Sequence, residues 1–396
     1  MDQSRILRTV ETEMADRIAV AVADNIVSPL GFTTADNYAA VKRGDTTLQR
    51  YEGQWELPTP FAASMVNRDE VLTACADAGI NGSYTFFEQM VLISVTKALQ
   101  QYEVDMTSKR TLFMLSTTKG NIDLLRKSVP GVANERLMLG VTAKVIADYF
   151  HCPNEPVVVS NACISGLCAQ IEAVRLLRAG FYDTVVVCGA DILSPFIVSG
   201  FQSLMALSDE PCRPFDEERM GINLGDAAAT IIYKGITADE LKTGQWHVAH
   251  DAIRNDAFHI SSPSRSAEGC FRALQNILQG IDTNDIAFVN AHGTATLFND
   301  EMESVAIDRA GLSELPVNSL KGYFGHTMGA AGVLETIISM HAAGNGIVLG
   351  TKGFENSGVS RRINVSAENK QTSKHSFVKI MSGFGGCNAA MLMVNA

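Results

Sequence analysis

VVVSNACISGLCAQIEAVRLL, residues 157–177, joins an apolar run to a stretch of small residues, and a cysteine lies at the join. The three contiguous β-branched valines at 157–159 are typical of a buried interior strand. The stretch after them predicts a helix with little side-chain bulk, at Gly166, Ala169 and Ala173. Such a helix can pack deep inside the molecule. The segment therefore predicts a buried strand–turn–helix elbow with Cys163 at its tip.

The position of Cys163 leaves two interpretations open. At a helix N-terminus, unpaired amides and the positive end of the helix dipole favour thiolate over thiol, which predicts a nucleophile of lowered pKa. The alternative is that Cys163 is a small buried hydrophobe without chemistry.

Length and composition favour one large α/β protein built of two packed halves. The chain has 396 residues, of which 46% are hydrophobic, and no Pro/Ser-rich linker interrupts it. The pattern restarts near Gln245. We therefore expect an N-terminal half at 1–245, which carries the cysteine, and a C-terminal half at 246–396.

Charge and cysteine usage exclude several classes. A net charge of −11 argues against a broad nucleic-acid footprint. The N-terminal stretch 1–18 has no apolar core and is not expected to be a secretory signal, and no apolar run is long enough for a membrane span. Eight scattered cysteines without a CxxC pair predict reduced thiols in a cytoplasmic protein and no metal site.

Strands and helices alternate along both halves, which predicts an α/β layered fold. In the first half we expect strands within 17–31, 111–120, 183–191 and 226–235, and helices within 84–102 and 135–150. In the second half we expect strands within 286–296 and 315–344, helices within 270–280 and 302–311, and a hairpin at 375–396. The order strand, loop, small-residue helix occurs at 157–177 and again at 316–341, a weak sign of duplication.

The loop 289–304 follows a predicted buried strand and carries His292, Thr294 and Thr296. The C-terminal ends of parallel strands collect active sites, which favours a functional role for His292 over that of a structural histidine. The threonines could bond a ligand amide. Asp300 and Glu303, by contrast, fit a helix N-cap and a first-turn acid.

Two further loops carry groups suited to chemistry. Lys321 and His326 share the loop 318–335, and Glu335 is the expected partner of the lysine. The loop 382–390 holds Phe384 among glycines, which allow the backbone to approach a ligand closely. A cysteine, two histidines and a lysine on such loops predict nucleophilic acyl chemistry, in which the histidines stabilise an enolate oxygen.

Six spaced motifs resemble those of the β-ketoacyl synthases of the thiolase superfamily. They are NACISG, RPFDEERMGINLGDAA (213–228), HISSP (259–263), NAHGTAT, LKGYFGHTMGAAG and GFGG. The resemblance implies a five-layered αβαβα fold with two pseudo-equivalent halves. It also implies a homodimer, with a heterodimer with a related chain as the alternative, and substrates held on acyl carrier protein.

The same resemblance assigns roles. Cys163 would take the acyl group, with its own amide and that of Phe384 as the oxyanion hole. His292 and His326 would hold a malonyl thioester during decarboxylation, giving a 3-oxoacyl thioester and carbon dioxide. Lys321 with Glu335 would orient the histidine loop. Thr294, Thr296 and Ser261 would bond the phosphopantetheine arm, which belongs to the carrier, and Phe384 would gate the two half-reactions. No cofactor of the enzyme's own is implied.

Some positions depart from the family pattern. Ile164 follows the nucleophile, where it would narrow the acyl tunnel, and Ser382 replaces an aromatic residue. Lys119 stands where an uncharged residue is usual, which argues against a long saturated chain unless the lysine points away. The segment 77–89 has no base for carrier docking. These departures suggest a specialised synthase, for polyenes or other secondary acyl products.

Three alternatives stay open. A thiolase would use coenzyme A and a second cysteine near the C-terminal glycine-rich loop, where Cys387 lies. A non-catalytic chain-length subunit would shape the product, but such subunits lose the nucleophile. A catalytic chain that works only beside such a partner is the third.

Overall fold

The protein is described by a computed structural model over residues 17–396. The expectation that residues 1–18 are not a secretory signal concerns a stretch of which residues 1–16 lie outside the described residues. Within 17–396, no helix combines the length and apolar character needed to cross a membrane.

The first half contains a five-stranded mixed sheet. Its strands, in spatial order, are β5 (Val157–Val159), β4 (Thr111–Ser116), β6 (Thr184–Asp191), β8 (Ala227–Thr237) and β1 (Arg17–Val27). β4 runs parallel to both its neighbours, whereas β8 is antiparallel to β6 and β1. β5 and β4 therefore end at the same edge of the sheet, which is where the Cys163 turn begins.

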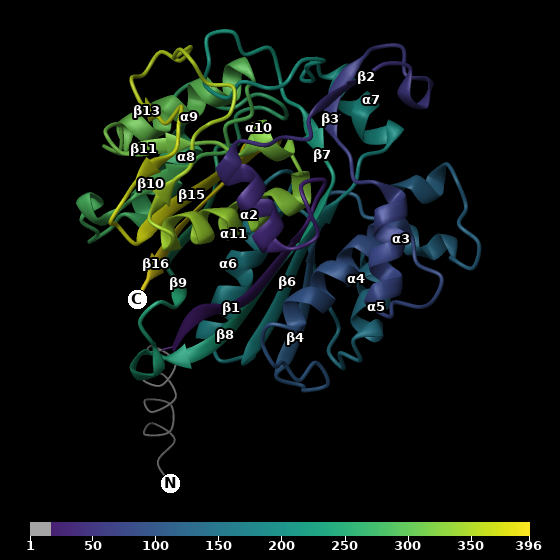
Figure 1. The fold of residues 1–396 in the computed structure, drawn as a ribbon. Helices are drawn as coiled ribbons and strands as arrows, with labels where there is room; N and C mark the ends of the chain where they lie inside the picture. The colour runs from purple at the N-terminus through teal and green to yellow at the C-terminus, as the bar shows by residue number, and fades with distance from the viewer. Residues whose placement is uncertain (1–16) are drawn as a thin grey trace.

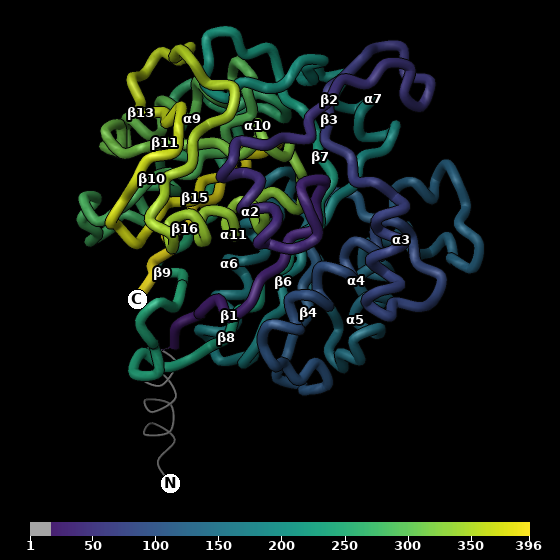
Figure 2. The backbone as a smooth tube through the Cα atoms, in the orientation of Figure 1, coloured from purple at the N-terminus to yellow at the C-terminus, as the bar shows by residue number. Residues whose placement is uncertain are grey.

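The second half repeats this strand order. Its strands are β11 (Pro316–Asn318), β10 (Phe288–Asn290), β15 (Ser376–Gly383), β16 (Cys387–Asn395) and β9 (Trp246–Asn255), with β13 (Asn364–Val365) added outside β11. β1 and β9 pair along a short antiparallel stretch that joins the halves. In Figure 2 the C-terminal strands, in yellow, run beside the green segments of the same half. The predicted repeat is confirmed as a repeat of topology.

Helices form three layers around these sheets (Figure 1). The central layer, between the halves, is α6 (Ser165–Arg178) and α11 (Ala331–Gly344). The outer helices of the first half are α3 (Arg68–Asp77), α4 (Phe86–Leu99) and α5 (Leu139–Tyr149); those of the second half are α8 (Glu268–Ile277) and α9 (Leu297–Arg309). The predicted αβαβα layering is confirmed.

The remaining elements are short or peripheral. They are α2 (Thr34–Arg43), α7 (Pro195–Ser203), α10 (Lys321–Phe324), β2 (Gln49–Tyr51), β3 (Phe61–Ser64), β7 (Leu224–Gly225), β12 (Ile347–Val348) and β14 (Lys370–Gln371).

Small residues allow the two central helices to approach closely, as predicted. A Cβ on Gly166 would lie 2.8 Å from the carbonyl oxygen of Gly329, closer than real Cβ atoms come to neighbouring atoms. This contact brings the start of α6, which follows Cys163, against the start of α11, which follows His326. The site is thus built where the two halves meet.

Two predicted helices have different starts. The helix expected at 302–311 begins at Leu297, because the chain leaves the extended conformation directly after Thr296. The helix expected at 135–150 begins at Leu139, because residues 134–137 form a separate 3₁₀ turn.

Candidate active site

Cys163 lies on a tight turn between β5 and α6. The preceding residue, Ala162, has a φ of +44°, which a non-glycine residue adopts only under strain. The Ser165 hydroxyl holds this turn, since its oxygen accepts from the amide of Asn161 at 2.8 Å and it donates to the carbonyl of Ala162 at 2.6 Å. The predicted elbow is therefore present, and it presents a largely buried thiol at the start of α6.

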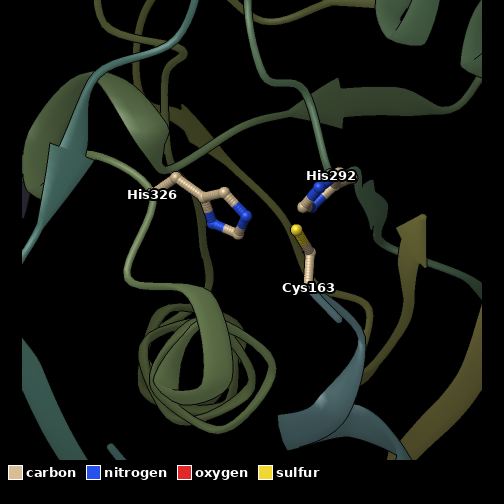
Figure 3. Close-up of side chains that lie close together, drawn as sticks. All are labelled: Cys163, His292 and His326. Atoms are coloured by element: carbon tan, nitrogen blue, oxygen red, sulfur yellow. The ribbon is translucent and has the colours of Figure 1, made fainter. Parts of the chain in front are cut away.

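The thiol of Cys163 meets two imidazoles from the other half of the molecule. The Sγ of Cys163 and a ring nitrogen of each of His292 and His326 all lie within 4.8 Å of one another. Figure 3 shows the three side chains pointing into one space, with the sulfur between the rings. The ring centroids are 5.0 Å apart and the ring planes are nearly perpendicular, at 83°. The structure thus brings together the three residues on which the predicted chemistry depends.

The hydrogen bonds of His326 fix its tautomer. The backbone amide of Met328 donates to its Nδ1 at 3.3 Å, so Nδ1 carries the lone pair and Nε2 carries the proton. Among the described residues that Nε2 has no hydrogen-bond partner, and neither has the buried Nδ1 of His292. Unpaired buried polar atoms are costly, so His326 Nε2, which carries a proton, is suited to donate to a substrate oxygen. No hydrogen bond among the described residues fixes the tautomer of His292.

The resting site is electrically neutral. Burial, reinforced by the charge of Lys321, lowers the pKa of both His292 and His326 well below 6.5. Burial also raises the pKa of Cys163 to about 12, against the smaller opposing effects of Lys321 and the Phe384 amide. The expectation of a lowered thiol pKa is therefore wrong, because burial disfavours the thiolate more than the start of the helix favours it.

Behind His292 lies a buried cluster of two lysines around one carboxylate. Lys321 donates from Nζ to the carbonyl of His292 at 3.0 Å and forms an ion pair with Glu335, as predicted. Lys379, from the centre of β15, forms a second ion pair with Glu335 at 2.6 Å. Burial alone would raise the pKa of Glu335, but the two lysine charges hold it below its ordinary value. Sequence reasoning missed Lys379, although a lysine within the otherwise apolar run FVKIM is a detectable signal.

Two buried carboxylates hold the backbone of the His292 loop. Glu303 accepts from the amides of His292 and Gly293, both at 2.7 Å, and Asp300 accepts from the amide of Thr294 at 2.9 Å. The interpretation of Asp300 as the N-cap is wrong, because Thr296 occupies that position; Asp300 is instead the acid in the first turn of α9, and Glu303 lies beyond that turn. Both carboxylates accept hydrogen bonds from the loop. They are positioning residues for His292.

A cleft of about 390 Å³ leads from the surface to Cys163. The predicted residues that line it are Cys163, Ser261, His292, Thr294, Thr296, His326 and Phe384. The hydroxyls of Thr294 and Thr296 lie 2.9 Å apart, and the ring of Phe384 packs against Phe201 with centroids 5.9 Å apart. Lys321 and Glu335 lie behind the cleft wall, so they act through His292.

Gly383 packs closely against the backbone of Cys163. A Cβ on Gly383 would lie 3.2 Å from the Cys163 nitrogen and 2.9 Å from the sulfur of Cys387, so a larger residue would crowd this corner. The neighbouring amide of Phe384 faces the Cys163 thiol.

Family models agree with this geometry. The model of the β-ketoacyl synthase N-terminal domain matches residues 66–236, and that of the β-ketoacyl synthase C-terminal domain matches residues 247–355. Together they match more than two thirds of the chain. This chain belongs to the β-ketoacyl synthase family. It is an acyltransferase of thiolase-like fold.

Relatives of this β-ketoacyl synthase come from fatty-acid and polyketide systems. A putative mitochondrial 3-oxoacyl-[acyl-carrier-protein] synthase of Schizosaccharomyces pombe is 25% identical over 92% of this chain and 96% of its own length. The ketoacyl synthase alpha subunit of the tetracenomycin polyketide synthase of Streptomyces glaucescens is 32% identical, over 60% of this chain and 59% of the relative. A ketosynthase solved with its chain length factor, from Xenorhabdus doucetiae, superposes with a TM-score of 0.83 at 23% identity, covering 96% of this chain and 98% of its own.

The departures of this synthase from the family pattern have local explanations. Lys119 turns toward Asp191, with which it forms a buried ion pair at 3.0 Å, so its charge is compensated. Ile164 is fully buried in the central hydrophobic core and is not among the residues that line the described cleft. Ser382 donates to the side chain of Asn388 at 2.8 Å.

Acidification should destabilise this synthase through His292 and His326. In the unfolded chain each imidazole binds a proton near its ordinary pKa of 6.5, whereas in the folded protein neither does. The unfolded state therefore binds more protons as the pH falls, and stability decreases with it. Each group contributes about 1.4 kcal/mol per pH unit, so the pair should cost on the order of 3 to 4 kcal/mol by about pH 5.

The measurement is urea unfolding at about pH 7 and about pH 5 for the wild type and for the variant His292→Asn, His326→Asn. Asp226 and Glu303 have pKa values raised to about 6 and about 7, so their protonation stabilises the folded protein as the pH falls. Both the wild type and the double variant contain these two acids, so their effect is common to the two proteins. The acid-induced loss should shrink in the double variant by the amount given. An unchanged loss would show that the imidazoles are protonated in the folded protein.

Proposed function

We propose that this protein catalyses decarboxylative Claisen condensation of a malonyl thioester with an acyl group held on Cys163, with both substrates carried on acyl carrier protein. The observation that supports this most is the neutral thiol between two unpaired, neutral imidazoles. A thiol is a suitable nucleophile for acyl transfer, and two neutral imidazoles can donate hydrogen bonds to the oxygen of an enolate.

In the first step the sulfur of Cys163 attacks the carbonyl carbon of the acyl thioester. The carbon–sulfur bond to the carrier arm breaks as the bond to Cys163 forms. The thiol proton passes to the ring nitrogen of His292 that lies near the sulfur, and then to the departing arm, which leaves as a free thiol. The amides of Cys163 and Phe384 hold the oxyanion.

In the second step a malonyl thioester takes the place of the first arm. Its thioester oxygen accepts hydrogen bonds from His326 Nε2 and from His292. Loss of carbon dioxide leaves its electron pair on the α-carbon, as an enolate. This carbon attacks the acyl-Cys163 carbonyl, a carbon–carbon bond forms, and Cys163 leaves as a thiolate that takes a proton from solvent. No metal or redox group is needed, because decarboxylation supplies the electron pair.

The polar wall of the cleft suits the carrier's arm. Ser261, Thr294 and Thr296 offer hydroxyls along one side, which we assign to the amides of phosphopantetheine. Phe384, on the glycine-rich loop beside Cys163, also lines the cleft and is the proposed gate. Lys321 and Glu335 position His292 from behind.

For assembly we propose a homodimer. The alternative is a heterodimer with a related non-catalytic chain, which the solved ketosynthase with its chain length factor suggests.

A non-catalytic role for this chain itself is disfavoured, because its nucleophile and both histidines are present and in contact. A thiolase is disfavoured because the Cys387 thiol donates to the carbonyl of Phe384 and does not line the cleft. Eight unpaired cysteines support a cytoplasmic protein. The segment 77–89, which has no base, supports a specialised synthase, for acyl chains such as polyenes.

The test is intact-mass measurement. Incubation with acyl carrier proteins loaded with acyl groups of different length and unsaturation should add one acyl mass to the protein, on Cys163. Malonyl carrier should then remove that mass and yield a 3-oxoacyl carrier. The variants His292→Ala and His326→Ala should still acylate, more slowly for His292→Ala, but should not condense. Acyl mass on Cys387, or none from any carrier, would refute the proposal.

A further inference from the structure

The mouth of the active-site cleft is surrounded by exposed apolar side chains. Seven of the thirteen large apolar residues that are exposed among the described residues gather there: Leu204, Met205, Met220, Phe258, Ile260, Leu297 and Phe298. We call these seven the apolar collar. Met205 is 92% exposed and Met220 81% exposed, so no part of residues 17–396 covers them. The other six exposed apolar residues do not line the cleft.

The collar is continuous with the cleft. Five of its members line the outer part of the cleft, and Phe258 and Ile260 flank His259, which also lines it. Four separate segments supply it: the turn after α7, the loop before β7 that carries Met220, the loop before Ser261 and the first turn of α9. Met205 is held outward by a backbone with a φ of +53°, a strained value for a non-glycine residue.

The collar offers almost no charge. Apart from histidines, the only ionisable cationic side chain among the described residues that line the cleft is Arg219, and it is buried. Its Nη1 donates to the carbonyls of Asp216 and Gly358, so the guanidinium is directed into the protein. The whole chain carries a net charge of −11, which repels an acidic partner at long range. Recognition at this surface therefore has to come from apolar contact.

We propose that the apolar collar is the docking surface for the carrier protein, and that it selects a carrier whose surface around the arm is apolar. This inference rests on the proposed function. A thioester that reaches Cys163 through the cleft is tethered to its carrier, so the carrier's face must lie against the rim of that cleft. The seven collar residues are that rim, and their burial against an apolar face supplies the binding free energy.

The experiment compares carrier-bound and carrier-free substrates. The variant Met205→Gln, Met220→Gln, Phe298→Gln should raise the KM for hexanoyl-loaded acyl carrier protein by about tenfold or more. Turnover of hexanoyl-N-acetylcysteamine, which has no carrier, should stay within about twofold. Phe181→Gln is the matched control, since Phe181 is 65% exposed but lies away from the cleft, on the turn before β6. It should change neither value.

Salt identifies the kind of contact. The carrier KM of the wild type should change by less than about threefold between about 50 mM and about 500 mM sodium chloride, because apolar contact is not screened. A steep increase with salt would overturn the proposal in favour of ionic docking. So would an unchanged carrier KM in the triple variant, or an equal loss with the carrier-free thioester.

Further readouts keep the docking test separate from the proposed function. Calorimetric binding of the loaded carrier to wild type and to Met205→Gln measures docking without turnover, and an exposed side chain can be replaced without unfolding the protein. If the carrier binds through the collar but no condensation occurs, the proposed function fails and docking stands. Binding of phosphatidylglycerol vesicles that the triple variant loses, with carrier binding unchanged, would assign the collar to a lipid surface. A collar-dependent change in oligomeric mass would assign it to a second copy.

Discussion

Cys163→Ala should abolish acyl transfer and condensation, lowering the condensation rate by at least about 10⁴-fold. The reason is that the substituted residue can form no covalent acyl intermediate, and a cysteine at another position would lie outside the space between His292 and His326. The fold should be retained, because the substitution removes one sulfur atom from a residue on a cleft wall. The measurements are intact mass after incubation with an acyl carrier thioester, and release of carbon dioxide from malonyl carrier.

Cys163→Gln separates the two half-reactions. A glutamine amide at this position occupies the place of an acyl thioester carbonyl, beside the amides of Cys163 and Phe384. Because the histidines that hold the enolate are untouched, malonyl decarboxylation should persist in this variant while acylation is lost. A folded Cys163→Gln protein without decarboxylation would contradict the division into two steps.

Cys387→Ala is the matched control. Cys387 is also a buried free cysteine, close to Gly383, but its thiol donates to the carbonyl of Phe384 and does not face the cleft. Its removal should leave the condensation rate within about threefold of wild type. A loss comparable to that of Cys163→Ala would favour the thiolase alternative, in which two cysteines share the chemistry.

Glu335→Gln should be the most destabilising single change at the site. It leaves the ammonium groups of Lys321 and Lys379 buried without a counter-charge, which typically costs about 3 to 5 kcal/mol. Lys321 also holds the carbonyl of His292, so the variant should lose condensation more severely than acylation. Urea unfolding at about pH 7 measures the first effect, and single-turnover mass measurement the second.

Lys379→Met is the informative counterpart. It removes the excess positive charge and leaves Lys321 and Glu335 as a neutral pair, so its cost should be under about 1.5 kcal/mol. Burial lowers the pKa of Lys379 to about 8, whereas in the unfolded chain it is near its ordinary 10.5. Between these values the unfolded state binds the additional proton, so wild-type stability should rise as the pH increases through this range. Lys379→Met should lose this rise. A rise that persists in Lys379→Met would show that another group causes it.

Local patterns were enough for the fold class and for the elbow. Residues that are adjacent in the sequence are sufficient to recognise three contiguous valines, a small-residue helix and an alternation of strands and helices. The motifs around Cys163, His292 and His326 each lie within a few residues, and together they identified the family. The pairing of Lys321 with Glu335 was predicted because a charged side chain in an apolar segment needs a partner of opposite charge.

Other properties depend on segments that are distant in the chain and become close only after packing. The pKa of Cys163 was predicted in the wrong direction, because the helix end favours a thiolate but the surrounding burial, which comes from both halves, favours the neutral thiol. Lys379 and the carboxylates of Asp300 and Glu303 acquire their roles only through contacts with the His292 loop and Glu335. The apolar collar is assembled from four segments, none of which has an unusual sequence by itself. Desolvation and proximity are properties of the packed interior, and a linear pattern does not contain them.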